Sequence, residues 1–209
     1  MFADLPLQEI GIVLGCMLVA LGFHEAMHAF TAHFLGDTTA QEQGRLTLNP
    51  LKHIDVVTTI VLPAVLMLLH LPPFFIAKPV PFDPDRVRHE EYGAALVALA
   101  GPFTNLVLAV LGSVVLRLGG DMVGADLGHI IAVFMQVNIL FFVFNMIPFP
   151  PLDGSRLLYA FAPEPMQRVM MQIEATGFMA LVAFMLILYP FVSPLVSNLS
   201  SGIFNFLLS

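Results

Sequence analysis

The sequence predicts an all-α polytopic membrane protein with about 4–5 transmembrane helices, a re-entrant segment and a short β-hairpin. Hydrophobic residues make up 58% of the 209 residues and charged residues only 11%, a composition that water solvates poorly. The longest polar stretches, 36–55 and 72–91, are too short to form an independent hydrophobic core. We therefore expect one integral-membrane domain over residues 1–209, with a core at 8–160 and C-terminal helices at 164–209.

The expected membrane spans are apolar runs separated by polar or proline-rich segments. Each of the four longest has enough apolar residues to cross a hydrocarbon core about 30 Å thick. Since no cationic segment and no small-residue cleavage site precede the first run, we expect it to remain in the mature protein. The four long runs are 7–35, 92–118, 127–147 and 169–192; a shorter internal run covers 54–71, and an apolar tail, whose crossing is left open, covers 193–209.

The first run contains the sequence His24-Glu25-Ala26-Met27-His28. Charged side chains at membrane depth cost on the order of 2.5–3.5 kcal/mol each on insertion scales, so they persist mainly where they coordinate, pair or react. Two histidines four residues apart lie on one helix face and can bind the same ion, and Glu25 can reach a water at that ion. The pattern is typical of a metal hydrolase, although a core helix can also hold such residues in hydrogen bonds to their neighbours.

A catalytic zinc usually takes three protein ligands and leaves the fourth position to water, so one further ligand is needed. The apolar run 127–147 is followed by Pro148, Pro150 and Pro151, which stop the helix and place Asp153 on a non-helical turn. Asp153 is therefore the best remaining candidate for the third ligand.

Several segments occur together in an order that resembles the site-2 protease family, the intramembrane zinc metalloproteases, in a minimal form without PDZ or CBS domains. The match covers most of residues 20–160. The segments are the His-Glu-x-x-His helix, Asn-Pro-Leu at 49–51, His-Ile-Asp at 53–55, Lys-Pro-Val-Pro at 78–81, Ala-Gly-Pro at 100–102 followed by Asn105, and 145–154 from an asparagine to Leu-Asp-Gly.

The resemblance implies one catalytic Zn²⁺ and a role for each residue around it. Two histidines, His24 and His28, and the carboxylate of Asp153 correspond to the family's zinc ligands. Glu25 corresponds to the general base, and Asn145 to the residue that holds the substrate backbone or its oxyanion. These five residues are the site predicted for this chain.

Substrate binding is predicted around that site. Asn105 and Lys78 are candidate substrate-binding residues, although an interhelical hydrogen bond is an equal expectation for Asn105. Residues 36–48 predict a short β-hairpin that turns at Gly44. Because a helical substrate must unwind before its carbonyls can be attacked, its extended segment could pair with this hairpin or with 77–82.

The implied function is regulated intramembrane proteolysis, the hydrolysis of peptide bonds in or near transmembrane helices of membrane-protein substrates. The expected partners are such substrates and the lipid bilayer of a prokaryotic cell (inner) membrane, with no nucleic acid and with the oligomeric state left open. A membrane metal carrier and a non-catalytic scaffold are the alternatives. A carrier has no need for Glu25 beside its first ligand, and a scaffold would be expected to have lost a ligand or this glutamate.

Topology requires one run to turn back, because simple alternation would place the histidines and Asp153 on opposite sides of the membrane. We expect 54–71 to be re-entrant, since it is short and broken by Pro63, with 72–81 returning as an extended segment. The positive-inside rule then makes the active-site end cytoplasmic. The cations expected at that end are Arg45, Lys52, Lys78, Arg86, Arg88, Arg156 and Arg168, with Arg117 opposite.

Overall fold

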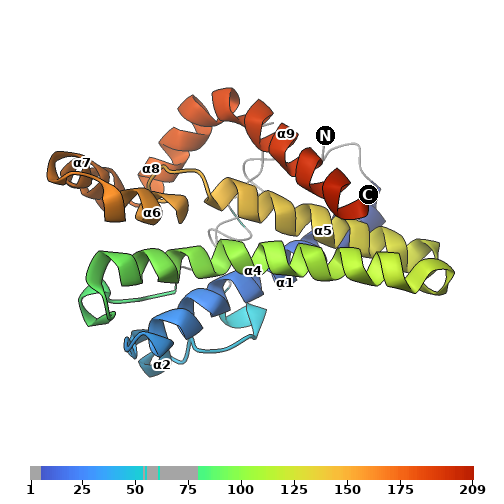
Figure 1. Ribbon diagram of the computed structural model, residues 1–209, viewed down its shortest axis with the longest axis horizontal. Helices are drawn as coiled ribbons and strands as arrows, with labels where there is room; N and C mark the ends of the chain where they lie inside the picture. Colours follow the sequence, from blue (N-terminus) through green and yellow to red (C-terminus); the bar gives the residue numbers. More distant parts are fainter. Residues whose placement is uncertain (1–5, 54, 56–60, 62–79) are drawn as a thin grey trace.

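The computed structural model describes residues 6–53, 55, 61 and 80–209, and within these ranges the chain forms helices and turns with no strand (Figure 1). The helices are α1 (Leu7–Phe34), α2 (Thr39–Glu42), η2 (Pro50–His53), η4 (Pro84–Arg86), α4 (Glu90–Gly119), η5 (Gly120–Val123), α5 (Ala125–Asn145), α6 (Gly154–Phe161), α7 (Glu164–Ala175), α8 (Phe178–Ala183), the π-helical η6 (Phe184–Leu188) and α9 (Tyr189–Leu208).

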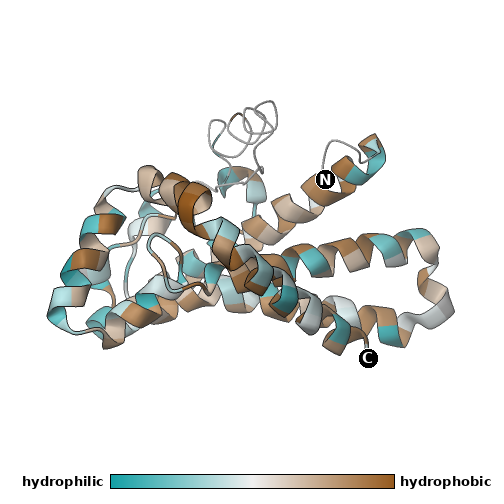
Figure 2. Ribbon diagram, turned by 90° about the horizontal axis from the view of Figure 1, so that it is seen from above, coloured by the Kyte–Doolittle hydropathy of each residue, from teal (hydrophilic) through white to brown (hydrophobic). Residues whose placement is uncertain are grey.

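Four helical stretches in the described part of the chain are long and apolar enough to cross a membrane, which confirms the predicted class. They are α1, α4, α5 and the continuous stretch Phe178–Leu208 formed by α8, η6 and α9. Figure 2 shows hydrophobic residues along most of their length. The last span begins later than predicted and includes the tail, because Gly177, with φ of 56°, separates α7 from the apolar α8.

The predicted β-hairpin at 36–48 is wrong, because residues 39–42 form the short helix α2. The Asp37 carboxylate accepts hydrogen bonds from the backbone N–H and the hydroxyl of Thr39, at 2.9 and 2.5 Å. Such a local side-chain bond starts a turn and competes with an extended strand. Gly44 does turn the chain, with φ of 64°.

The predicted re-entrant run at 54–71, its return at 72–81 and Lys78 lie outside the described residues except at positions 55, 61, 80 and 81. The described chain on either side of this gap contacts the same helix. Pro50 packs closely against Gly22 of α1, and the Val80 N–H donates to the Glu25 carboxylate at 3.2 Å. Both flanks of the gap therefore lie beside the C-terminal half of α1.

Consecutive spans among α1, α4 and α5 run antiparallel to each other. The Arg88 N–H donates to the Leu35 carbonyl at 3.0 Å, which joins the end of α1 to the chain that enters α4. At the opposite end, His129 of α5 lies 2.9 Å from Glu9 of α1. The C-terminal ends of α1 and α5 and the N-terminal end of α4 therefore lie together.

Small side chains allow these helices to approach closely. Ala20, Ala26 and Ala29 of α1 are fully buried, and α4 packs against both α1 and α5 (Figure 1). In lipid, helices associate through such close packing and through interhelical hydrogen bonds more than through apolar burial. The helix α9 packs on α5, where Val196 contacts a cluster around Ile139.

Candidate metal centre

Three potential metal ligands meet where α1 faces the turn after α5. His24 Nε2 lies 3.1 Å from His28 Nε2 and 3.1 Å from Asp153 Oδ2, and His28 Nε2 lies 3.5 Å from the same carboxylate oxygen. Tetrahedral zinc with bonds of about 2.0–2.1 Å separates neighbouring ligand atoms by about 3.3–3.4 Å. One ion therefore fits this triangle.

The proton positions on the two imidazoles also fit a metal ion. Nδ1 of His28 lies 2.7 Å from the Val97 carbonyl, and Nδ1 of His24 lies 2.7 Å from the Asn105 amide oxygen. Because these oxygens can only accept, both Nδ1 atoms carry the proton, and each ring in its neutral form has its lone pair on the Nε2 atom that faces Asp153. Three electron-pair donors thus converge, and a cation bound there would resolve their mutual repulsion.

The Asp153 carboxylate is held as an anion at this point. Its Oδ2 atom is buried and accepts no hydrogen bond from the described residues. An Nε2–H group of a protonated His24 or His28 is the one donor within reach in that part of the chain. Burial by itself would raise the pKa of Asp153, but His28 and His24, when protonated in the metal-free site, attract the carboxylate and hold that pKa below its ordinary range. An anionic oxygen beside two imidazoles completes a donor set that suits zinc.

A tight turn after α5 carries Asp153 back to α1. Proline residues end the helix, and the turn is closed by backbone bonds from Leu152 N–H to the Phe149 carbonyl at 2.9 Å and from Ser155 N–H to the Leu152 carbonyl at 3.0 Å. A Cβ atom at Gly154 would lie 2.4 Å from the Met146 carbonyl oxygen, so only glycine fits there.

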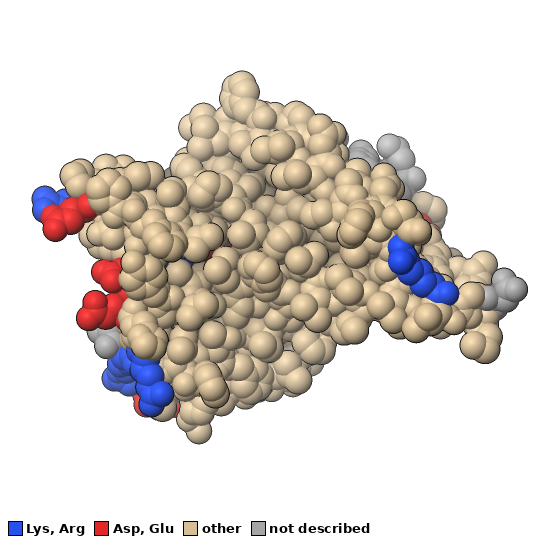
Figure 3. Space-filling model, viewed as in Figure 1, with Lys and Arg blue, Asp and Glu red and all other residues tan. Residues whose placement is uncertain are grey.

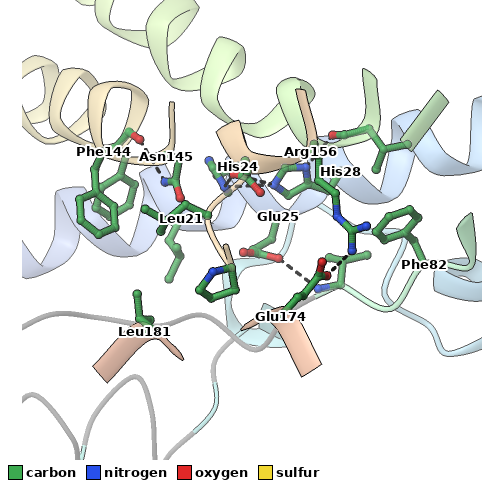
Figure 4. Close-up of a pocket in the computed structure, with 17 residues that line it drawn as sticks. Leu21, His24, Glu25, His28, Phe82, Phe144, Asn145, Arg156, Glu174 and Leu181 are labelled. Atoms are coloured by element: carbon green, nitrogen blue, oxygen red, sulfur yellow. Dashed lines mark hydrogen bonds and ion pairs between the residues drawn. The ribbon is translucent and has the colours of Figure 1, made fainter. Parts of the chain in front are cut away.

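Glu25 and Asn145 line the same cavity as the three ligands (Figure 4). The cavity measures about 450 Å³, and its walls come from α1, α4, α5 and the segments that follow them. Glu25 is buried, and one of its oxygens accepts from the Val80 N–H. Asn145, the last residue of α5, donates one amide N–H to the Phe141 carbonyl at 3.0 Å, and its amide carries a second.

Asn105 lies behind the metal centre, where it makes the interhelical hydrogen bond that was the alternative expectation for it. Its side chain is fully buried, is absent from the cavity wall and hydrogen-bonds to His24. His53 is also fully buried, and its Nε2 lies 2.9 Å from the Thr47 carbonyl. Lys78 lies outside the described residues.

The cavity wall also contains a pair of charged residues that the sequence analysis did not single out as functional. Arg156 of α6 forms an ion pair with Glu174 of α7 and lies 5.9 Å from the ring centre of Phe82 (Figure 4). Arg156 follows Asp153 by three residues, which places it one helical turn away on the same side. This spacing could have predicted from the sequence that Arg156 lies beside the metal centre. Glu174 is brought in only by the folding of α7 over α6.

Comparison with known proteins places these features in context. A model of peptidase family M50 matches residues 111–189, which include Asn145 and Asp153. The protein named "Putative zinc metalloprotease YwhC" from Bacillus subtilis (strain 168) is 35% identical over 203 residues, covering 94% of this chain and 87% of that protein.

Two mycobacterial proteins that share another name are also similar to this chain. The protein named "Putative zinc metalloprotease Rip2" from Mycolicibacterium smegmatis is 32% identical over 191 residues, covering 87% of this chain and 70% of that protein. The protein of the same name from Mycobacterium tuberculosis (strain H37Rv) is 35% identical over 161 residues, covering 73% of this chain and 59% of that protein. No solved structure matches this chain.

Proposed function

Since this chain belongs to peptidase family M50, the site-2 protease family of zinc metalloproteases, we propose that it hydrolyses peptide bonds in or near transmembrane helices of other membrane proteins. One observation carries the proposal: Nε2 of His24, Nε2 of His28 and an oxygen of Asp153 converge inside a cavity that Glu25 also lines. These three residues are the proposed ligands of a single catalytic zinc ion.

The chemistry follows from the residues around that ion. When bound, zinc supplies Lewis acidity toward water and toward the scissile carbonyl. Glu25 lines the cavity beside His24, so it is placed to take the proton of the attacking water and to pass it to the leaving amine. Asn145 has an amide N–H that can donate to the negative charge developing on the carbonyl oxygen.

Access to the cavity favours an extended substrate segment. A carbonyl within a helix is engaged in the helix's own hydrogen bonds, so the substrate must unwind locally to present it. With α2 helical, the edge of a hairpin at 36–48 is no longer available to receive that segment. Val80, Phe82 and Leu181 line the cavity and offer the unwound chain an apolar wall.

The charge distribution supports an active site on the cytoplasmic side, and the bacterial relatives support a prokaryotic cell (inner) membrane. In Figure 3 most charged side chains of the visible face lie at the end where α2, α7 and the start of α4 are found, and the broad middle carries almost none. Arg86 of η4, Arg88 just before α4 and Arg168 of α7 lie at that end, whereas Arg117 lies at the far end of α4. By the positive-inside rule the end rich in arginine faces the cytoplasm.

The decisive experiment replaces Glu25 with glutamine and measures turnover of a transmembrane substrate together with zinc content. Glu25→Gln removes the general base but no ligand, so turnover should fall by a factor of about 10²–10⁴ while one zinc stays bound. Glu9→Gln is the matched control, because Glu9 lies in the same helix and pairs with His129 at the opposite end. Turnover at the wild-type rate in Glu25→Gln would contradict the assigned role.

A further inference from the structure

A chain of buried amides links α1, α4 and α5 behind the metal centre. Asn105 of α4 accepts a hydrogen bond from His24 Nδ1 at 2.7 Å and donates from its own amide nitrogen to the Ala20 carbonyl at 3.2 Å and to Asn138 Oδ1 at 2.9 Å. Asn138 of α5 donates in turn to the Phe134 carbonyl at 2.8 Å. Both asparagines are fully buried, and neither lines the cavity.

The direction of every hydrogen bond in this chain is determined by the two backbone carbonyls at its ends. The Phe134 carbonyl can only accept, so the amide nitrogen of Asn138 must face it and its oxygen must face Asn105. The Ala20 carbonyl also accepts only, so it too requires the amide nitrogen of Asn105. Both N–H groups of Asn105 are then used, and its oxygen has no choice but to face His24.

This polarity matters because it decides which nitrogen of His24 is free. An amide oxygen at Nδ1 requires a proton there and leaves the lone pair on Nε2, which faces His28 and Asp153. If the Asn105 amide were reversed, an N–H group would face Nδ1 and favour the tautomer with its proton on Nε2, so the nitrogen that faces His28 and Asp153 would have no lone pair for a metal. His28 obtains the same tautomer directly from the Val97 backbone carbonyl.

We propose that Asn105 and Asn138 are positioning residues that hold His24 in its metal-binding tautomer and ring orientation through a directional relay anchored on the backbone of α1 and α5. The proposal rests on the function proposed above. A general need for polar contacts between membrane helices does not account for the arrangement, because such contacts require no particular direction. Here both N–H groups of the Asn105 amide are engaged elsewhere, so its oxygen is the only atom of that amide that can face His24.

The test measures the zinc affinity of the purified full-length protein in detergent by competition with a chromophoric chelator. Asn105→Leu keeps nearly the same volume but removes the acceptor, so we expect zinc affinity to fall about 10–100-fold. Asn105→Asp keeps an acceptor for His24 and, when protonated in this buried position, one donor for the Ala20 carbonyl or Asn138, so it should lose clearly less affinity than Asn105→Leu. Asn138→Leu should fall between wild type and Asn105→Leu, because Asn105 retains its bond to Ala20.

Ser113→Ala is the matched control. Ser113 is buried in the same helix and donates to the Leu207 carbonyl at 2.6 Å, far along α4 from the metal centre, so its removal costs one buried hydrogen bond and should leave zinc affinity unchanged. In the zinc-free protein, imidazole ¹⁵N magnetic resonance should show His24 protonated at Nδ1 in the wild type and as a tautomer mixture in Asn105→Leu. A role in packing alone would not change that signal.

The outcomes separate this inference from the proposed function. Equal affinity of wild type and Asn105→Leu would overturn the relay, as would equal losses in Asn105→Leu and Asn105→Asp with no change in the His24 signal. If the wild-type protein itself bound no zinc, the proposed function would fail first. The expected order of zinc affinities, with one zinc bound by the wild type and an unchanged affinity in Ser113→Ala, supports both the relay and the proposed function.

Discussion

Gly101 lies where α4 passes the two imidazoles of α1. A Cβ atom at this position would lie 2.5 Å from His28 Nε2 and 2.8 Å from His24 Cε1, closer than atoms in proteins approach without displacement. We predict that Gly101→Ala displaces the two imidazole rings from their metal-binding positions. Zinc affinity should fall at least about tenfold, as it does when residues around metal ligands are disturbed. Chelator competition measures the effect.

Gly112→Ala provides the comparison for this prediction. It is also in α4, where an added Cβ would meet Cγ of the flexible Met135 side chain at 2.6 Å. Overpacking there should cost about 1–3 kcal/mol of stability and leave zinc affinity unaltered. A similar loss of zinc affinity in both variants would mean that the whole helix, and not the contact of Gly101 with the imidazoles, is responsible.

Substitutions of Asn145 and Asp153 should affect different properties, the first the turnover rate and the second the zinc content. Asn145→Ala removes the proposed donor to the developing oxyanion, so turnover should fall about 10²–10³-fold with zinc content retained. Asp153→Ala removes the proposed third ligand, so zinc occupancy should fall at low free metal concentration. Turnover and metal content are measured on the same preparations. Full zinc occupancy in Asp153→Ala would show that this residue is not the third ligand.

At the scale of elements, Asp37 joins the end of α1 to two other segments. Its fully buried carboxylate accepts from Thr39 at the start of α2 and from the Asp83 N–H, at 2.8 Å, next to η4. Burial opposes ionisation of Asp37, but these hydrogen bonds prevail and hold its pKa below the ordinary value of 3.8. The ionised carboxylate therefore stabilises the connection between these elements.

The stability contributed by Asp37 should depend on pH with a defined sign. Because its pKa is lowered by folding, the contribution is present above the unfolded value of 3.8 and is lost as the pH falls through the lower folded value. Asp37→Asn should be less stable than wild type near neutral pH by on the order of 1–3 kcal/mol. The gap should narrow as the pH falls below about 4.

Thermal unfolding in detergent between about pH 7 and about pH 3 measures this gap. Asp126→Asn, which changes an exposed carboxylate in the first turn of α5, is the control and should show little difference from wild type. A gap that stays constant across this range would mean that Asp37 stabilises the protein through its shape and not through its charge.

At the scale of the whole molecule, the four spans imply a sidedness that can be measured. In a Cys16→Ser background, single cysteines at Gln43, Arg168 and Met122 are all at exposed positions, the first two near the active-site end and the third in the turn between α4 and α5. Reagents confined to the cell exterior should label Met122→Cys and leave Gln43→Cys and Arg168→Cys unlabelled.

The same labelling after permeabilisation shows that the unlabelled positions are reactive, which is the control. Exterior labelling at Gln43 and Arg168 together would reverse the orientation but keep the fold. Exterior labelling at only one of these two positions would contradict the arrangement of the spans, because α2 and α7 follow α1 and α5, whose C-terminal ends share one side.

Much of this protein follows from local sequence patterns. Hydropathy predicts the membrane class and, to within a few residues, the first three of the spans, because every segment that crosses lipid must itself be apolar. The relation of His24, Glu25 and His28 follows from the helical repeat, which is a short-range property. The resemblance of the motifs to site-2 proteases identified the family that the comparisons then supported.

Only the tertiary structure decided the features that join distant parts of the chain. Asp153 reaches the histidines from the turn after α5, Asn105 of α4 meets His24 of α1, and Glu174 pairs with Arg156 after α7 folds back. The mistaken hairpin shows the same limit at short range, since one buried carboxylate, Asp37, was enough to favour a helical turn over a strand. Periodicity along a chain reports which face a residue occupies, but its partner on another helix depends on how the helices pack.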